Sequence, residues 1–120
     1  MHTIIPGMAT KDGKPSCAFG VMGGAYQPMG HALVLSNMLD FGMDPQQAID
    51  FPRLFWGEDG MLEAENGIPA NVRSELAARG HTLRDAPGPW GGAQIIAIDH
   101  ECGFLIGGSD PRKDGCALGW

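Results

Sequence analysis

The sequence predicts an α+β fold in one domain, residues 1–120, with antiparallel sheets and flanking helices. Short apolar runs of strand length alternate with segments in which apolar residues recur at helical spacing. The 19 Gly and nine Pro residues are spread along the chain, as in proteins with many short elements and tight turns. The expected order, ββα-αββ-αβββ, combines hairpins with helices that can cover a sheet.

Composition excludes several classes of protein. The 120 residues are 43% hydrophobic and 18% charged, as in soluble globular domains, and no apolar run is long enough to cross a membrane. A net charge of −6 with eight scattered Lys and Arg residues argues against nucleic-acid binding. The stretch Met1–Pro6 has no basic region before a long apolar core, so no signal peptide is expected.

The three cysteines are Cys17, Cys102 and Cys116. Their odd number and spacing predict neither a disulfide framework nor a zinc site, and we expect no cofactor or metal. Free thiols favour a reducing, cytoplasmic compartment. Cys17 lies on an expected strand, away from any helix N-terminus that would activate its thiol, so a cysteine nucleophile is not favoured.

The first two strands are expected at Thr3–Ala9 and Ser16–Met22, paired antiparallel through a turn at Asp12-Gly13. The second strand ends in Gly23 and Gly24, directly before a helix that extends from Met29 to Phe41. Paired glycines allow positive φ and close approach to the main chain, and a helix start offers free N–H groups. This junction suits a carboxylate, a phosphate or an oxyanion; an ordinary turn is the alternative.

The helix after the glycines has one apolar face and ends at Gly42. Its expected buried residues are His31, Val34, Leu35, Met38 and Leu39. No second ligand or base stands four residues after His31, so a hydrogen-bonded boundary histidine is favoured over a catalytic one.

Asp44, Pro45 and Gln47 form the start signal of a short second helix, with Asp44 and Gln47 spaced as a capping box. Pro52 ends it. Strands are then expected at Arg53–Trp56 and Met61–Glu65 around an acidic turn.

A surface helix is expected at Pro69–Arg79, with Val72, Leu76 and Ala77 facing inward. Extended chain follows at His81–Arg84. The β-branched run Ala93–Asp99 predicts a strand buried on both faces, and Phe104–Gly107 returns beside it.

Four other residues have both a structural and a functional interpretation. Asp110 and Arg112 follow a glycine pair and are expected to tie loops together instead of acting in catalysis. A buried Arg53 would need a carboxylate partner. Trp90 is expected to be a buried anchor, with a lid as the alternative.

Several motifs, taken together and in order, resemble the C-terminal small subunit of the γ-glutamyltranspeptidase family. They are His2-Thr3-Ile4-Ile5-Pro6, Gly20-Val21-Met22-Gly23-Gly24, Asp40-Phe41-Gly42-Met43 with Ala48-Ile49-Asp50-Phe51-Pro52-Arg53, and Gly107-Gly108-Ser109-Asp110-Pro111-Arg112 with Asp114-Gly115. The resemblance covers nearly the whole chain and is closest to the transpeptidase-like, acylase branch.

The resemblance implies the distal part of an N-terminal-nucleophile hydrolase αββα sandwich. In this family a threonine freed by self-cleavage attacks a γ-glutamyl amide, and the acyl-enzyme passes to water or an amino acid. The family's oxyanion hole would fall on the N–H groups of Gly23 and Gly24. His2 and Thr3 would stand where typical members bind the substrate carboxylate with two serines, so glutathione as the substrate is open.

The family's nucleophilic threonine has no counterpart in this chain, because neither Thr3 nor Thr10 stands at its position. We therefore expect the chain to be inactive alone and to need an upstream segment, a large-subunit partner or a second copy. A γ-glutamyl or related amide is the expected substrate, with nucleic acid and membrane excluded as partners. Exported members leave a periplasmic or extracellular location open. The alternative is a non-catalytic domain for assembly or anion binding.

Overall fold

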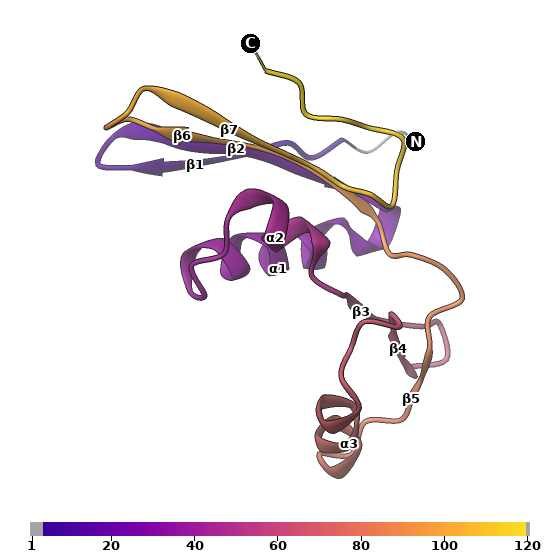
Figure 1. The fold of residues 1–120 in the computed structure, drawn as a ribbon. Helices are drawn as coiled ribbons and strands as arrows, with labels where there is room; N and C mark the ends of the chain where they lie inside the picture. The colour runs from indigo at the N-terminus through magenta and orange to yellow at the C-terminus, as the bar shows by residue number, and fades with distance from the viewer. Residues whose placement is uncertain (1–3, 120) are drawn as a thin grey trace. The chain divides into compact units, whose positions relative to one another are not determined.

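The computed structural model describes residues 4–119 and divides the chain into two compact units. Unit 1 comprises residues 1–50 and 91–120, and unit 2 comprises residues 51–90. Figure 1 shows both units. The fold is α+β, as predicted, and the order of helices and strands agrees with the expected one.

Unit 1 contains a four-stranded antiparallel sheet in the order β1-β2-β6-β7 (Figure 1). Its strands are β1 (Gly7–Lys11), β2 (Lys14–Met22), β6 (Gly92–Asp99) and β7 (Phe104–Ser109). Asp12 and Gly13 both have positive φ, 52° and 76°, which confirms a tight hairpin turn of the primed type between β1 and β2. The pairing of the first two strands was therefore predictable from the turn.

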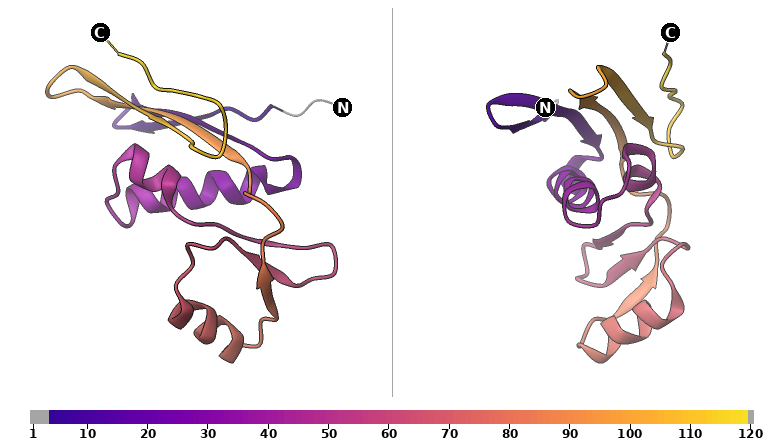
Figure 2. Two further views of the ribbon diagram at one scale, coloured as in Figure 1. Left: turned by 45° about the vertical axis from the view of Figure 1, so that its right-hand side comes forward. Right: turned by 60° about the vertical axis from the view of Figure 1, so that its left-hand side comes forward.

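Two helices, α1 (Gln27–Leu39) and α2 (Pro45–Asp50), lie on one face of this sheet (Figure 2). The residues of β2 that point toward them include the buried Cys17 and Val21. In α1, Gly30 allows close contact with β2, because a Cβ there would lie 2.6 Å from Val21 Cγ1. The core of unit 1 lies between this sheet face and the two helices.

The buried face of α1 agrees with the predicted one only in part: Val34 is buried as expected, but other positions differ. Its buried residues are Gln27, Gly30, Val34 and Asn37, whereas Leu39 is 72% exposed. The apolar residues alone did not identify the buried face, because a polar residue, Asn37, belongs to it. Its burial is tolerated because its amide donates a hydrogen bond to the carbonyl of Ala48 in α2 (3.4 Å).

The capping box of α2 is confirmed. The Gln47 N–H donates to Asp44 Oδ1 (2.8 Å), and the Asp44 N–H donates to Gln47 Oε1 (3.2 Å).

The prediction that β6 is buried on both faces is wrong. Ile95 is 2% exposed, but Ile96, its neighbour on the opposite face, is 48% exposed. The pairing register places Met8, Ala18 and Ile96 on this second face, which neither α1 nor α2 covers. We call it the open face of the sheet; its β-branched residues resemble those of a fully covered strand.

Unit 2 contains a small sheet in the order β3-β4-β5 and one helix. The elements are β3 (Leu54–Trp56), β4 (Leu62–Ala64), α3 (Ala70–Ala78) and β5 (Leu83–Asp85). β5 pairs with β4 in parallel, so this sheet is mixed instead of fully antiparallel. The helix α3 has no buried residue, and Val72 is 38% exposed, so the predicted inward face is wrong.

Polar contacts to the main chain organise unit 2. Arg53 is fully buried, and its Nη1 donates to the carbonyl of Trp90 (2.6 Å). The carboxylate of Glu65 accepts the main-chain N–H groups of Arg53 and Trp90, both at 2.9 Å. The Trp90 ring meets Phe55 edge-on at 5.0 Å. These contacts agree with the anchor interpretation of Trp90.

Candidate active site

The paired glycines connect the end of β2 to a short 3-10 turn, η1 (Gly24–Tyr26), which continues directly into α1. Gly23 has φ 136° and ψ 25°, and Gly24 has φ 58°. Both angles lie where a side chain is disfavoured, and the value at Gly23 is outside any region that an L-residue adopts readily. The turn is closed by a hydrogen bond from the Tyr26 N–H to the Gly23 carbonyl (3.1 Å).

Gly23 packs closely against Gly91, the residue before β6. A Cβ on Gly23 would lie 3.0 Å from the Cα of Gly91, and a Cβ on Gly91 would lie 2.5 Å from the carbonyl oxygen of Met22. The two main chains therefore touch with no space for a side chain between them. A Cβ on Gly24 would meet no atom within 4 Å, so that side of the turn is open.

The N–H groups of Gly23 and Gly24 donate to no acceptor within the described part of the chain. They stand at the N-terminal end of η1 and α1, where N–H groups have no partner inside the helix. Two adjacent N–H groups at such a position can bind one anionic oxygen.

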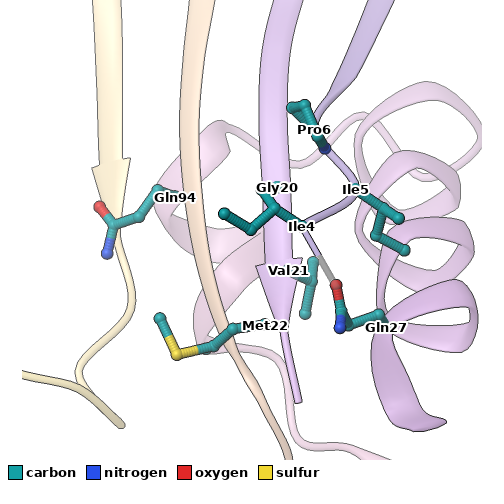
Figure 3. A pocket seen from close by; sticks show the side chains of 9 residues that line it. Ile4, Ile5, Pro6, Gly20, Val21, Met22, Gln27 and Gln94 are labelled. Atoms are coloured by element: carbon teal, nitrogen blue, oxygen red, sulfur yellow. The ribbon is translucent and has the colours of Figure 1, made fainter. Parts of the chain in front are cut away.

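A pocket of about 230 Å³ lies at the end of β2, where it is lined by Met22, the residue before the glycine pair (Figure 3). It is lined by Ile4, Ile5, Pro6, Gly20, Val21, Met22, Gln27, Gly92 and Gln94. The lining is mostly apolar, and its polar side chains are the two amides. Gly23 and Gly24 do not line the pocket themselves, but Met22 and Gln27, on either side of the turn in the sequence, do.

The predicted site residues fall into two groups. Gly23 and Gly24 directly follow Met22, which lines the pocket. His2 and Thr3 lie outside the described residues, so their proposed role in carboxylate binding stays a prediction.

Sequence reasoning did not predict the contribution of Ile4, Ile5 and Pro6 to the pocket. Ile4 is 72% exposed and Ile5 is 42% exposed, and an exposed apolar segment near a chain end carries no signal of its own. Gln27, at the first position of α1, was also missed, because a polar side chain at a helix start carries no sequence signal of burial.

His31 lies on the first turns of α1 and hydrogen-bonds to two main-chain oxygens. Its Nδ1 is 2.7 Å from the Gln27 carbonyl, and its Nε2 is 2.7 Å from the Ile5 carbonyl. These contacts agree with the interpretation as a hydrogen-bonded boundary histidine.

Asp110 and Arg112 join loops, as expected. Asp110 is fully buried and its Oδ2 accepts the N–H of Ala93 (2.7 Å). Arg112 Nη1 contacts Asp110 Oδ1 (3.2 Å) and donates to the carbonyl of Ile49 (3.0 Å). They hold the beginning of β6 next to the end of β7 and to α2.

Cys17 is buried, and burial raises the pKa of its thiol, which agrees with an unreactive side chain. The part of the chain that the structure describes holds no group of three His, Cys, Asp or Glu residues suited to a metal ion. Across residues 4–119, no helix has the length and apolar character needed to span a bilayer.

Solved structures of similar fold define the class of this chain. The cephalosporin acylase from Bacillus halodurans is 43% identical with a TM-score of 0.91, and the match covers 99% of this chain and 23% of that one. The γ-glutamyltranspeptidase from Pseudomonas nitroreducens, complexed with L-DON, is 27% identical with a TM-score of 0.85. The match covers 100% of this chain and 63% of that one. The fold is therefore that of the N-terminal-nucleophile hydrolases.

The family described as gamma-glutamyltranspeptidase matches residues 1–120, and the chain belongs to this family. The glutathione hydrolase-like YwrD proenzyme of Bacillus subtilis (strain 168) is 40% identical over 98% of this chain and 24% of its own length. The acylase ACY 1 proenzyme of Pseudomonas sp. (strain V22) is 38% identical over 94% of this chain and 20% of its own. The chain thus spans between a fifth and a quarter of these two relatives.

Proposed function

We propose that this chain is the C-terminal part of the small subunit of a γ-glutamyltranspeptidase-like amidohydrolase or acyltransferase. The carrying observation is the glycine turn, whose two N–H groups donate to no acceptor in the described chain and which directly follows Met22, a residue that lines the pocket. Family membership supports the reaction class, since related proteins are named glutathione hydrolases and acylases.

In the proposed reaction a threonine hydroxyl attacks the carbonyl carbon of an amide, and its proton passes to an amine base. The carbonyl oxygen becomes an oxyanion that accepts hydrogen bonds from the Gly23 and Gly24 N–H groups. The C–N bond then breaks, the amine leaves with the proton, and the acyl-enzyme transfers its acyl group to water or to an amino acid.

The nucleophile and the rest of the substrate site would come from a polypeptide segment outside these 120 residues. The relatives are four to five times as long, as the coverage of 20–24% indicates. His2 and Thr3 would contribute to binding the carboxylate of a γ-glutamyl or related substrate.

The experiment compares the chain alone with the chain joined to the upstream polypeptide of its source, with γ-glutamyl-p-nitroanilide as substrate. We expect hydrolysis only from the joined protein, and native mass spectrometry identifies the polypeptide that carries an N-terminal threonine. Hydrolysis by the 120-residue chain alone would contradict the proposal that the nucleophile lies elsewhere.

The role of the turn is tested by Gly24→Ala, with Gly103→Ala as the matched control. Both glycines have positive φ, 58° and 75°, and a Cβ at either would meet no atom within 4 Å. The two substitutions therefore place similar strain on the main chain, but only Gly24 belongs to the turn that follows the pocket residue Met22. Alanine keeps the main-chain N–H, but the strain at φ 58° should displace this N–H from the oxyanion. We expect Gly24→Ala to lower kcat by up to roughly 10²-fold, the cost when an oxyanion donor no longer reaches its acceptor, and Gly103→Ala to leave kcat unchanged.

A second candidate is a non-catalytic assembly or anion-binding domain, which the open face of the sheet favours. Titration of the labelled chain with inorganic phosphate would support this candidate if the Gly23 and Gly24 amide resonances shift while the joined protein hydrolyses no amide.

A further inference from the structure

His31 connects two walls of the pocket. Its Nδ1 contacts the carbonyl of Gln27 on α1, and its Nε2 contacts the carbonyl of Ile5 on the segment before β1, each at 2.7 Å. Gln27 and Ile5 both line the pocket beside the glycine turn. The imidazole also packs against the ring of Phe19 on β2, with ring centroids 5.3 Å apart. The His31 side chain therefore contacts α1, β2 and the segment before β1.

The two contacts determine how many protons the ring carries. A carbonyl oxygen only accepts hydrogen bonds, and a neutral imidazole has a single N–H. Simultaneous donation to both carbonyls requires protons on both nitrogens, so the ring that makes both bonds is an imidazolium. A neutral ring would leave one nitrogen lone pair facing a carbonyl oxygen at 2.7 Å.

No carboxylate on the contacting elements offers a simpler explanation for such a cation. The helix α1 (Gln27–Leu39) contains no acidic residue, and neither does the segment Ile4–Pro6. The only charged side chain in β2 is Lys14, at the end of the strand farthest from the pocket. The partners of both ring nitrogens are thus carbonyl oxygens, which are fixed in direction by the main chain.

We propose that His31 is a positioning residue which, as an imidazolium, ties the segment Ile4–Pro6 to α1 and thereby sets the width of the pocket. The use of this pocket by a substrate rests on the proposed function, whereas the tie itself does not. Without the tie, Ile4 and Ile5 have little to hold them, because both are largely exposed.

The test uses nuclear magnetic resonance on the labelled 120-residue chain, with His31→Leu, His31→Gln and the control His100→Leu. His100 also bonds to one main-chain carbonyl, that of Pro15 (2.7 Å), which does not line the pocket. We expect His31→Leu to lower the order parameters of Ile4 and Ile5 from about 0.85 to below about 0.6, with β2 unchanged. His31→Gln keeps one N–H donor for Ile5 and should restore part of the rigidity, and His100→Leu should have no effect on these residues.

A direct measurement on the wild-type chain complements the variants. Long-range proton–nitrogen spectra should show a proton on both ring nitrogens of His31. A ring with one unprotonated nitrogen next to a rigid Ile5 would overturn the proposal, as would unchanged order parameters in His31→Leu. The spectra decide the question even if His31→Leu does not fold.

These outcomes are distinguishable from failure of the proposed function, because no substrate is present. If the joined protein hydrolyses no amide while Ile5 loses order in His31→Leu, the positioning role stands and the reaction is wrong. If the joined protein is active, His31→Leu should raise KM more than it lowers kcat, and His31→Gln should recover part of the loss.

Discussion

Asp110 and Arg112 hydrogen-bond to main-chain groups of unit 1. Asp110 accepts the Ala93 N–H and donates its own N–H to the Ala93 carbonyl (3.0 Å), and Arg112 bonds to the Ile49 carbonyl. A buried carboxylate with these partners is well satisfied, which explains how a fully buried Asp is tolerated. Their positions fix the beginning of β6, which runs next to the glycine turn.

The cysteines differ in exposure, and their reactivity should follow it. Cys17 is buried with a raised thiol pKa, whereas Cys102 and Cys116 are exposed. Because the thiolate is the reactive form, we expect iodoacetamide at neutral pH to modify two thiols quickly and Cys17 only after unfolding in urea. Intact-mass spectrometry over time measures this. Equal rates for all three would show that Cys17 is accessible in the folded chain.

At the scale of single elements, the short helix α2 depends on its capping box. Asp44→Ala removes the acceptor of the Gln47 N–H and should destabilise the chain by about 1 kcal/mol. Asp50→Ala is the control, because Asp50 ends the helix, where a negative charge is unfavourable. Urea unfolding measures both free energies of unfolding. An equal loss in the two variants would argue against a specific capping effect.

The turn between β6 and β7 predicts how the stability of the chain depends on pH. The N–H groups of Cys102 and Glu101 donate to Asp99 Oδ1 (3.0 and 2.9 Å) and lower the pKa of this carboxyl. A lowered folded-state pKa contributes stability above the ordinary aspartate range, and this contribution disappears as the pH falls through the lowered value. Asp99→Asn should therefore destabilise the chain at pH 7 and have less effect at acid pH. Asp114→Asn serves as the control in urea titrations at both pH values.

Sequence patterns predicted where helices and turns begin better than they predicted which residues are buried. The Asp12-Gly13 turn and the capping box were correctly identified because their hydrogen bonds involve neighbours in the sequence. The buried stripe of α1 was not, since Asn37 is buried through a partner on another helix. The bond between His31 and Ile5 joins residues 26 positions apart, and no local pattern marks it.

At the scale of the whole molecule, membership of the family and the α+β class were predictable from motif order, and both are confirmed. The open face of the sheet was not predictable from periodicity, because apolar β-branched residues occur on both faces of β6. The roles of Gly23, Gly24, His2 and Thr3 in substrate binding and catalysis stay predictions.

The open face should make the isolated chain associate with itself. Ile96 and Leu105 are 48% and 69% exposed, and exposed apolar patches of this kind favour association. We expect sedimentation velocity to show concentration-dependent oligomers that are reduced in Ile96→Lys. Leu39→Lys, at a 72% exposed position on α1, is the control and should not change the distribution. A strictly monomeric wild-type chain at high concentration would contradict the expectation.

The contact between Gly23 and Gly91 also limits how this protein can evolve. A Cβ on Gly23 would meet the Cα of Gly91, and a Cβ on Gly91 would meet the carbonyl oxygen of Met22, so a side chain at either position cannot be accommodated by a change at the other. Random mutagenesis with selection for correct folding alone should therefore retain both glycines. Their persistence among variants would reflect the geometry of the main chain and would not by itself be a sign of catalysis.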